Sequence, residues 1–115
     1  MLTIYGIKNC DTMKKALAWL EAHGIAHVFH DYKKAGIDAV TLADWENSLG
    51  WENLLNRRGT TWRKLDAETQ AGIDRNSALQ LMREHPSLIK RPVVDTGTTL
   101  LCGFDEDEWQ AKLEK

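Results

Sequence analysis

The sequence predicts an α/β fold in which a four-stranded mixed sheet is interrupted by a helical insertion. Three observations predict it. About thirty N-terminal residues have the pattern strand, helix, strand; about sixty residues with helical periodicity follow; and a strand pattern with a turn signal returns before a final helix. Strand and helix patterns in this order are typical of layered domains that contain both kinds of element.

The two strands of the N-terminal part are expected at residues 2–5, ending near Gly6, and at residues 25–32. Both segments alternate in polarity and contain β-branched or aromatic side chains, as half-buried strands do. Two strands joined by a helix within so short a segment form a βαβ unit. We therefore expect the strands to be parallel, with a right-handed crossover.

The helix between these strands is expected to begin at Asp11 or Thr12 and to close at His23-Gly24. Glycine just after the last turn is a common helix stop signal. One apolar stripe with the spacing i, i+4, i+7 is formed by Met13, Leu17 and Leu20.

Residues 34–89 are predicted to form the helical insertion. Helical periodicity extends over residues 39–56 and 66–86. Thr41 and Asp66 are the expected N-caps, because each precedes a run of good helix formers.

The last part of the chain is predicted to be a hairpin over residues 92–104, which turns at residues 95–97, followed by a helix with an acidic start. With the βαβ unit, this order gives a thioredoxin-like arrangement within a single domain. Its thioredoxin-like parts are residues 1–33 and 90–115.

Composition excludes several classes of protein. Hydrophobic residues make up 43% and charged residues 28% of the 115 residues, and the net charge of −2 gives no reason to expect nucleic acid or an anionic membrane as a partner. No apolar run approaches the roughly 20 residues that cross a bilayer, and no secretion signal is evident, so we expect a cytoplasmic protein. A monomer is the default expectation. No metal site is expected, because suitable spacing is lacking around His23, His27, His30 and His85.

The run "KNCDTMKK" places Cys10 at the turn between the first strand and the first helix. Its sulfur is expected near the first N–H groups of the helix. Lys8 and Lys14 add positive charge nearby, and the negative charge of Asp11 opposes their effect. A thiol with a pKa of about 8.5 is only ~3% ionised at pH 7, and such surroundings lower that pKa. A reactive thiolate is the favoured interpretation, and an inert cysteine in a tight turn is the alternative.

Cys102 lies in the apolar segment "TLLCGF" and is expected to be a core cysteine rather than a resolving one. Met13 stands where a Cys-x-x-Cys motif would have its second thiol. A redox cycle at Cys10 must therefore use an external thiol, such as glutathione, or Cys102.

Two further stretches offer arginines for anion binding. Arg91 precedes Pro92, which cannot donate to a strand ladder; this predicts an edge strand or a strand start, and the bond can be cis. The Arg91 guanidinium suits an oxyanion or a carboxylate, although a solvated surface arginine is the simpler interpretation. Residues 57–65 read as a polar loop centred on Gly59, with a weak anion-binding signal from Arg57, Arg58 and Arg63.

The sequence resembles the ArsC/Spx family of thioredoxin-fold proteins, and most closely its YffB-type, arsenate-reductase-like branch. The likeness runs through "LTIYGIKNCDTMKKALAWLE", "FHDYKKAGID", "NLLNRRGTTWRKLD", "HPSLIKRPVV" and "CGFDEDEW". It implies that Cys10 is the redox nucleophile and that Arg91, before a usually cis Pro92, binds the anionic substrate. It also implies that Arg58 helps to bind the anionic substrate. If the alignment of this loop with the family is shifted by one residue, Arg57 has that role instead.

Lys8, Asn9 and Pro92 are also expected to line the site for substrate or glutathione, and Lys14 is a further candidate. The expected function is a glutathione-dependent thiol reductase in which one cysteine forms a mixed disulfide. Its substrate would be an oxidised thiol or an oxyanion, and glutathione would be a co-substrate rather than a bound cofactor.

Departures from the family pattern bear on the alternatives. Arsenate reductases have histidine and asparagine where this chain has Gly6 and Ile7, and arginine where it has Gly103. Reduction of arsenate itself is therefore a third option. Spx regulators have a second cysteine where this chain has Met13, so their disulfide switch cannot form here. A Spx-like adaptor that binds RNA polymerase or another protein without turnover is the rival interpretation.

Overall fold

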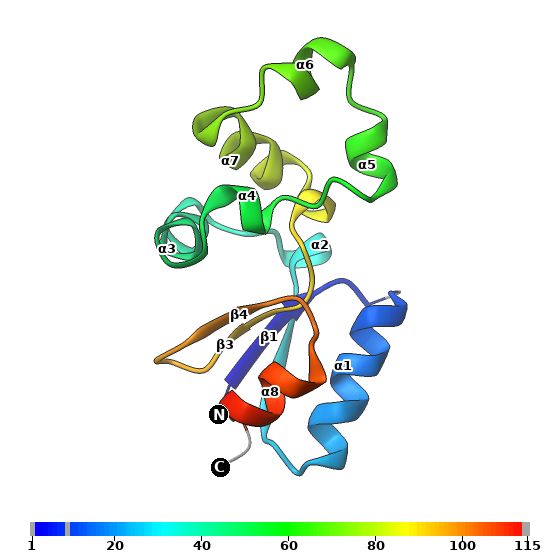
Figure 1. Ribbon diagram of the computed structural model, residues 1–115, viewed down its shortest axis with the longest axis vertical. Helices are drawn as coiled ribbons and strands as arrows, with labels where there is room; N and C mark the ends of the chain where they lie inside the picture. Colours follow the sequence, from blue (N-terminus) through cyan, green and yellow to red (C-terminus); the bar gives the residue numbers. More distant parts are fainter. Residues whose placement is uncertain (1, 9, 114–115) are drawn as a thin grey trace. The chain divides into compact units, whose positions relative to one another are not determined.

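The computed structural model describes residues 2–8 and 10–113, which divide into two compact units (Figure 1). The sheet unit contains the chain up to Asp31 and from Arg91 onward, and the helical unit is Tyr32–Lys90. The predicted insertion, residues 34–89, lies within the helical unit. No helix in the described residues is both long and apolar enough to cross a membrane.

The sheet has the strand order β2-β1-β3-β4. β1 pairs in parallel with β2 and antiparallel with β3, and β3 pairs antiparallel with β4. A parallel βαβ half joined to an antiparallel hairpin half confirms the predicted mixed sheet and thioredoxin-like fold. The strands are Leu2–Gly6 (β1), His27–Asp31 (β2), Val93–Asp95 (β3) and Leu100–Cys102 (β4).

Pro92 lies immediately before β3, and the Arg91-Pro92 peptide bond is cis. β3 pairs with a neighbour on each side, so the expectation of an edge strand is wrong and that of a strand start is correct. The missing N–H of Pro92 costs the ladder nothing at this position. Its carbonyl accepts a hydrogen bond from the N–H of Gly103 at 2.8 Å.

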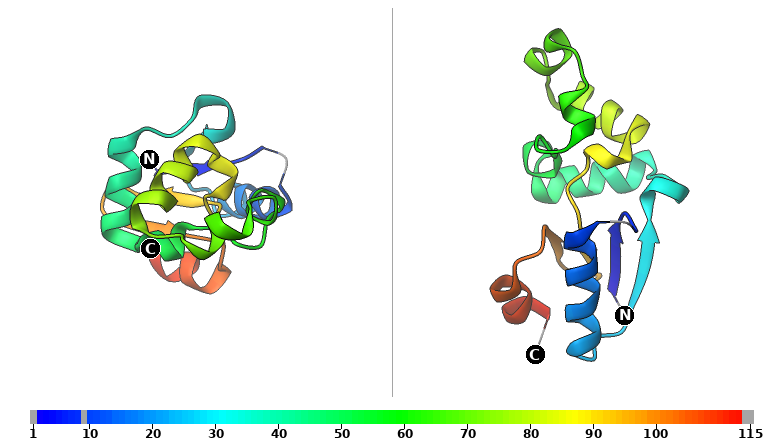
Figure 2. Two further views of the ribbon diagram at one scale, coloured as in Figure 1. Left: turned by 90° about the horizontal axis from the view of Figure 1, so that it is seen from above. Right: turned by 90° about the vertical axis from the view of Figure 1, so that its right-hand side faces the viewer.

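Helix α1 (Asp11–Ala22) is the crossover between β1 and β2, and it runs alongside the sheet in the right-hand view of Figure 2. It begins where Cys10 adopts an extended backbone and serves as the N-cap. The carboxylate of Asp11 is well placed in the first turn, where the helix dipole favours negative charge. The helix closes at His23, as predicted, and Gly24 turns the chain with a φ of +64°.

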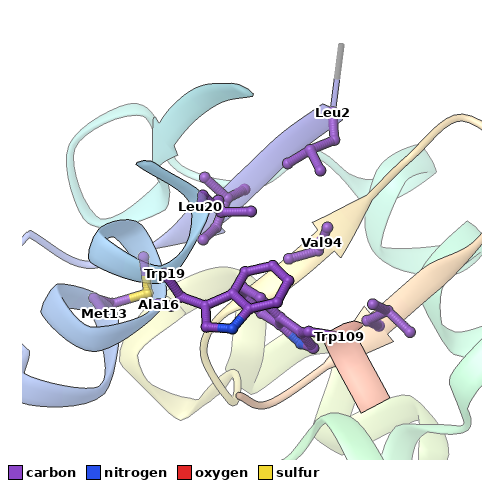
Figure 3. Packing of buried hydrophobic residues seen from close by; sticks show 9 residues of the cluster. Leu2, Met13, Ala16, Trp19, Leu20, Val94 and Trp109 are labelled. Carbon is purple, nitrogen blue, oxygen red and sulfur yellow. The ribbon is translucent and has the colours of Figure 1, made fainter. Parts of the chain in front are cut away.

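One face of the sheet is covered by α1 and by α8 (Glu106–Leu113). In Figure 3, Trp19 of α1 lies beside Trp109 of α8 and near Val94 of β3. The two indole rings meet edge to face, with centroids 5.6 Å apart, and Nε1 of Trp109 donates to the carbonyl of Gly103 at 3.2 Å. The buried members of this cluster are Leu2, Ile4, Met13, Ala16, Trp19, Leu20, Val94, Leu101 and Trp109.

The helical unit consists of short helices. They are α2 (Tyr32–Ala35), α3 (Ala39–Leu49), α4 (Trp51–Leu54), α5 (Thr60–Arg63), α6 (Ala67–Ala71), α7 (Arg75–Glu84) and the 3₁₀ turn η1 (Pro86–Leu88). The predicted N-cap Asp66 is confirmed, but Thr41 is wrong: Asp38 caps α3 by accepting from the N–H of Thr41 at 2.7 Å. The polar loop predicted at residues 57–65 is also partly wrong, because α5 forms within it.

Hydrogen bonds join the two ends of the helical unit. The buried hydroxyl of Tyr32, its first residue, donates to the carbonyl of Ile89 at 2.9 Å. An antiparallel bridge pairs Leu55 with Ile89. In this bridge the N–H of Asn56 donates to Leu88 and that of Lys90 to Leu54, each at 2.7 Å.

Tyr32→Phe should destabilise the protein by about 1–3 kcal/mol, because it leaves a buried carbonyl of Ile89 without its donor while retaining the ring. Urea denaturation followed by tryptophan fluorescence measures the change. Tyr32→Leu, which also removes ring packing, should cost more. Equal stability of Tyr32→Phe and the unmodified protein would show that this hydrogen bond contributes nothing.

Candidate functional site

Cys10 and Arg91 meet in the sheet unit although they lie 81 positions apart in the chain. Nε of Arg91 donates to Sγ of Cys10 at 3.5 Å, and both side chains are partly buried. The register that pairs Tyr5 with Val93 brings the residues after β1 beside those before β3. The pairing of β1 with β3 therefore places the thiol and the guanidinium together at the end of the sheet where β1 ends and β3 begins.

The surroundings of Cys10 favour its thiolate. Burial is the largest single influence and by itself raises the pKa of the thiol. The hydrogen bond and charge of Arg91, together with the backbone N–H groups of Met13 and Thr12, outweigh burial and hold the pKa of Cys10 below its ordinary value. The hydrogen bond from Arg91 is the largest of the influences that lower the pKa of Cys10.

The predicted lysines contribute less than expected. The groups that lower the pKa of Cys10 are Arg91 and backbone N–H groups, rather than Lys8 or Lys14. Both lysine side chains are exposed to solvent, which screens their charge. Asn9, also predicted to line the site, lies outside the described residues.

Gly6, at the end of β1, is covered by the side chain of Met13. A Cβ added to Gly6 would overlap the thioether of Met13, which is fully buried. A side chain at position 6 and methionine at position 13 therefore compete for one space. At the other departure from arsenate reductases, Gly103 has a φ of +85° and open space where a Cβ would be.

Cys102 is a free cysteine, half-buried rather than fully enclosed in the core. In the hairpin Val94 pairs with Leu101, and both belong to the cluster under α1 and α8. Because side chains alternate along a strand, Cys102 lies on the opposite face of the sheet. Cys10, in contrast, packs against that cluster. The structure does not bring the two thiols together.

The arginines predicted to bind anions in the loop belong to the helical unit, so their placement relative to Cys10 stays a prediction. Arg57 and Arg58 are both exposed. The Arg57 guanidinium lies over the ring of Trp62, 5.5 Å from its centroid. The side chain of Arg58 has no hydrogen-bond or ion-pair partner within residues 2–8 and 10–113, and Arg63 is likewise exposed in α5.

No metal centre is found in the described part of the chain: no three side chains of His, Cys, Asp or Glu group together there. The chemistry this site offers is that of a thiolate beside a guanidinium. The thiolate of such a pair can attack a disulfide. The guanidinium can bind the negatively charged groups of a thiol compound.

Comparison with known proteins identifies the family to which this chain belongs. The profile of the ArsC family matches residues 5–112. The chain belongs to the ArsC family. Cys10 and Arg91 both lie within the part that matches the family.

Three relatives of this ArsC-family protein are informative. The solved structure of a YFFB protein is 50% identical, with a TM-score of 0.93 over 98% of this chain and 99% of that one. An arsenate reductase (ArsC) related protein from Brucella melitensis is 51% identical, with a TM-score of 0.79 over 99% and 95% of the two chains. The global transcriptional regulator Spx of Streptococcus pneumoniae is 29% identical over 100% of this chain and 87% of its own.

Sequence reasoning missed two residues that shape the sites in this ArsC-family chain. It did not foresee that Met13 fills the space above Gly6, and only a three-dimensional contact reveals this. It also passed over Asn56, whose side-chain oxygen accepts the N–H of Arg58 at 3.1 Å. Asparagine two positions before a loop residue is a known turn signal, so the sequence did contain a clue to this second one.

Arg91→Met should raise the pKa of Cys10, because it removes both a charged donor and a positive charge from the thiolate. The rate of alkylation by iodoacetamide, measured against pH, should reach its midpoint at a higher pH and fall severalfold at pH 7. Lys8→Met and Lys14→Met are the matched controls and should leave the profile close to that of the unmodified protein.

The sign for stability follows from the same lowered pKa. The folded protein holds the Cys10 proton less tightly than the unfolded chain does, so ionisation of Cys10 stabilises the fold at high pH. This contribution is lost as pH falls through the folded-state pKa.

An alkylation profile of Arg91→Met that matches the unmodified protein would contradict the assigned role of the guanidinium.

Proposed function

We propose that this ArsC-family protein is a thiol oxidoreductase that uses Cys10 as its single nucleophile and glutathione as co-substrate. The observation that carries the proposal is the contact between Nε of Arg91 and Sγ of Cys10 at 3.5 Å. A thiolate is the reactive form of cysteine, and a neighbouring guanidinium increases its population at neutral pH. We expect this reaction in a reducing compartment, the cytoplasm, where free thiols persist.

The proposed reaction exchanges one disulfide for another. The thiolate of Cys10 attacks a mixed disulfide between a substrate thiol and glutathione. A bond forms between Cys10 and the glutathione sulfur, and the substrate leaves as a thiolate. A second glutathione thiolate then attacks the glutathione sulfur on Cys10, which releases oxidised glutathione and restores the Cys10 thiolate. In sum, the substrate thiol is released from its mixed disulfide, and one glutathione thiol is oxidised as it joins the glutathione already held in that disulfide.

An external thiol fits the placement of the two cysteines. Cys102 lies on the face of the sheet opposite the cluster that Cys10 contacts, and Met13 removes a nearby partner thiol. Glutathione carries two carboxylates, for which arginines are well-suited partners. We propose that Arg58 and Arg91 offer charge-assisted contacts to these carboxylates.

Incubation of the reduced protein with oxidised glutathione should add one glutathionyl group to Cys10, because its thiolate is the more available nucleophile. Intact mass spectrometry followed by peptide mapping locates the adduct. Cys10→Ser should abolish it and Cys102→Ser should not change it. An adduct found on Cys102 and not on Cys10 would disprove the assignment.

A second function, a Spx-like adaptor, is favoured by the match to Spx along the whole of this chain. In that case the fold would bind a protein such as RNA polymerase, and no turnover would be needed. The lack of a cysteine at Met13 disfavours a disulfide switch but not binding itself.

Affinity capture with the purified protein separates the two functions, since an enzyme of small thiols needs no lasting protein partner. We expect no stoichiometric polymerase partner from a lysate of the source cells, with either the unmodified chain or Cys10→Ser. Polymerase retained in equal amounts by both would establish the adaptor in place of the enzyme.

Arsenate reduction is the weakest option. Met13 occupies the space that a side chain at position 6 would need, and Gly103 provides no guanidinium. The site therefore lacks two of the polar side chains that the resemblance connects with arsenate.

A further inference from the structure

The first turn of α1 packs against the end of β1, where Gly6 leaves room for it. Met13, the third residue of α1, is fully buried, and its thioether occupies the space in which a Cβ of residue 6 would lie. Gly6 has no positive φ and pairs with Asp31 in the regular register of the sheet, so its backbone would accept a larger residue. The glycine is therefore needed for the close approach of Met13 and not for the conformation of the chain.

Met13 also acts on the nucleophile, through its backbone. The N–H groups of Met13 and Thr12 lie close enough to Sγ of Cys10 to lower the pKa of the thiol, although neither makes a full capping hydrogen bond. Of the two, the N–H of Met13 has the larger influence, and this influence exceeds that of the charge of Arg91. An incomplete hydrogen bond weakens steeply as its atoms separate, so the effect depends on where the first turn of α1 lies.

A side chain at position 6 would disturb this arrangement. The thioether of methionine is flexible, but the cluster members Ile4, Ala16 and Leu20 are fully buried, and protein interiors leave little empty space. An added Cβ must therefore lift the first turn from β1 or drive the thioether toward Cys10, which packs against the same cluster. The first movement takes the N–H groups away from the sulfur, and the second buries the sulfur further. Both disfavour the thiolate.

We propose that Met13 is a positioning residue for the Cys10 nucleophile, because its contact with Gly6 holds the first turn of α1 where two backbone N–H groups lie beside the sulfur. This inference rests on the proposed function, in which Cys10 reacts as a thiolate. It makes glycine at position 6 and methionine at position 13 one paired feature, whereas the sequence presents them as two separate departures from related proteins. The pair and the nucleophile all belong to the sheet unit.

The charged groups around Cys10 stay the same in the variants that test this proposal. Arg91 acts on the sulfur from the segment before β3, and Asp31 of β2 is half-buried beside Gly6. Exposed charges nearby in the sequence are carried by Lys8, Asp11 and Lys14. Because the variants replace only uncharged residues, a displaced pH profile reports the position of the first turn and not an altered charge.

The test measures alkylation of Cys10 by iodoacetamide against pH, in a Cys102→Ser background that leaves one thiol. Gly6→Ala should move the midpoint of the profile to higher pH and lower the rate at pH 7 about threefold, because interactions at a helix N-terminus have effects of about this size. At about pH 10, where the thiol is ionised in each variant, the rates should agree to within about twofold. That convergence would show that the population of thiolate changes and the access of the reagent does not.

Variants of Met13 identify the contact. Met13→Ala removes the hold on the first turn and should also raise the midpoint, whereas Met13→Leu keeps a large apolar side chain and should leave it nearly unchanged. In the double variant Gly6→Ala/Met13→Ala, the new methyl group enters the space that the thioether has left. Its midpoint should lie nearer to that of the unmodified protein than the midpoint of Gly6→Ala does, so the two substitutions should be non-additive.

Leu20→Ala is the matched control, because Leu20 is a fully buried member of the same cluster and lies about two turns beyond Met13 in the same helix. It should lower the midpoint of urea denaturation at least as much as Met13→Ala does, and it should leave the alkylation profile unchanged. If circular dichroism shows that Gly6→Ala does not fold, the comparison of Met13→Ala with Leu20→Ala decides.

The outcomes separate this inference from the proposed function. If the unmodified protein is glutathionylated at Cys10 and neither Gly6→Ala nor Met13→Ala displaces the profile, the role of Met13 is disproved and the enzyme stands. Additive shifts in the double variant, unequal rates at about pH 10, or an equal displacement by Leu20→Ala also disprove it. If the unmodified protein forms no adduct at Cys10 with oxidised glutathione, the proposed function itself fails.

Discussion

The attraction between the Arg91 guanidinium and the Cys10 sulfur is the interaction on which the proposed chemistry of this protein depends. Burial alone would keep the thiol neutral, and a neutral thiol packed against an apolar cluster is inert. The guanidinium, together with the backbone N–H groups of Met13 and Thr12, reverses that balance. Its effect requires that a residue near the end of the chain be returned to the end of the first strand, and the antiparallel pairing of β1 with β3 does this.

Local patterns were sufficient to predict much of the fold. The alternation of β1, the apolar stripe of α1 and the stop at His23-Gly24 depend on neighbouring residues, and the structure confirms them. The second strand, predicted at residues 25–32, spans only His27–Asp31 and does not alternate between buried and exposed positions. The start of α3 shows where local patterns fail. Asp38 and Thr41 are both capping residue types three positions apart, and the helix begins after the aspartate, whose side chain accepts the N–H of Thr41. Helix α5 is a single turn tied to Ser87, a contact that no local window contains.

The candidate site divides in the same manner. The position of a thiol at a helix start could be predicted from "KNCDTMKK", because that setting is local. The importance of Arg91 could not be predicted from its own neighbours, which suggested a solvated surface arginine; the family resemblance identified it. The lysines beside Cys10 in sequence proved less important than a distant arginine. Proximity along the chain is a poor guide to field strength when the side chains extend into water.

The hydrogen bond from Tyr32 to Ile89 has a consequence for how the chain folds. Closing a flexible loop of roughly sixty residues costs about 3–4 kcal/mol in chain entropy, and β3 must reach the βαβ half of the sheet across such a segment. In the helical unit, the first residue, Tyr32, is bonded to the penultimate residue, Ile89. Once this unit has formed, β2 and β3 are brought together as if they were close in sequence, and the sheet can form between them at a smaller entropic cost. The order of events that this favours is assembly of the insertion before completion of the sheet.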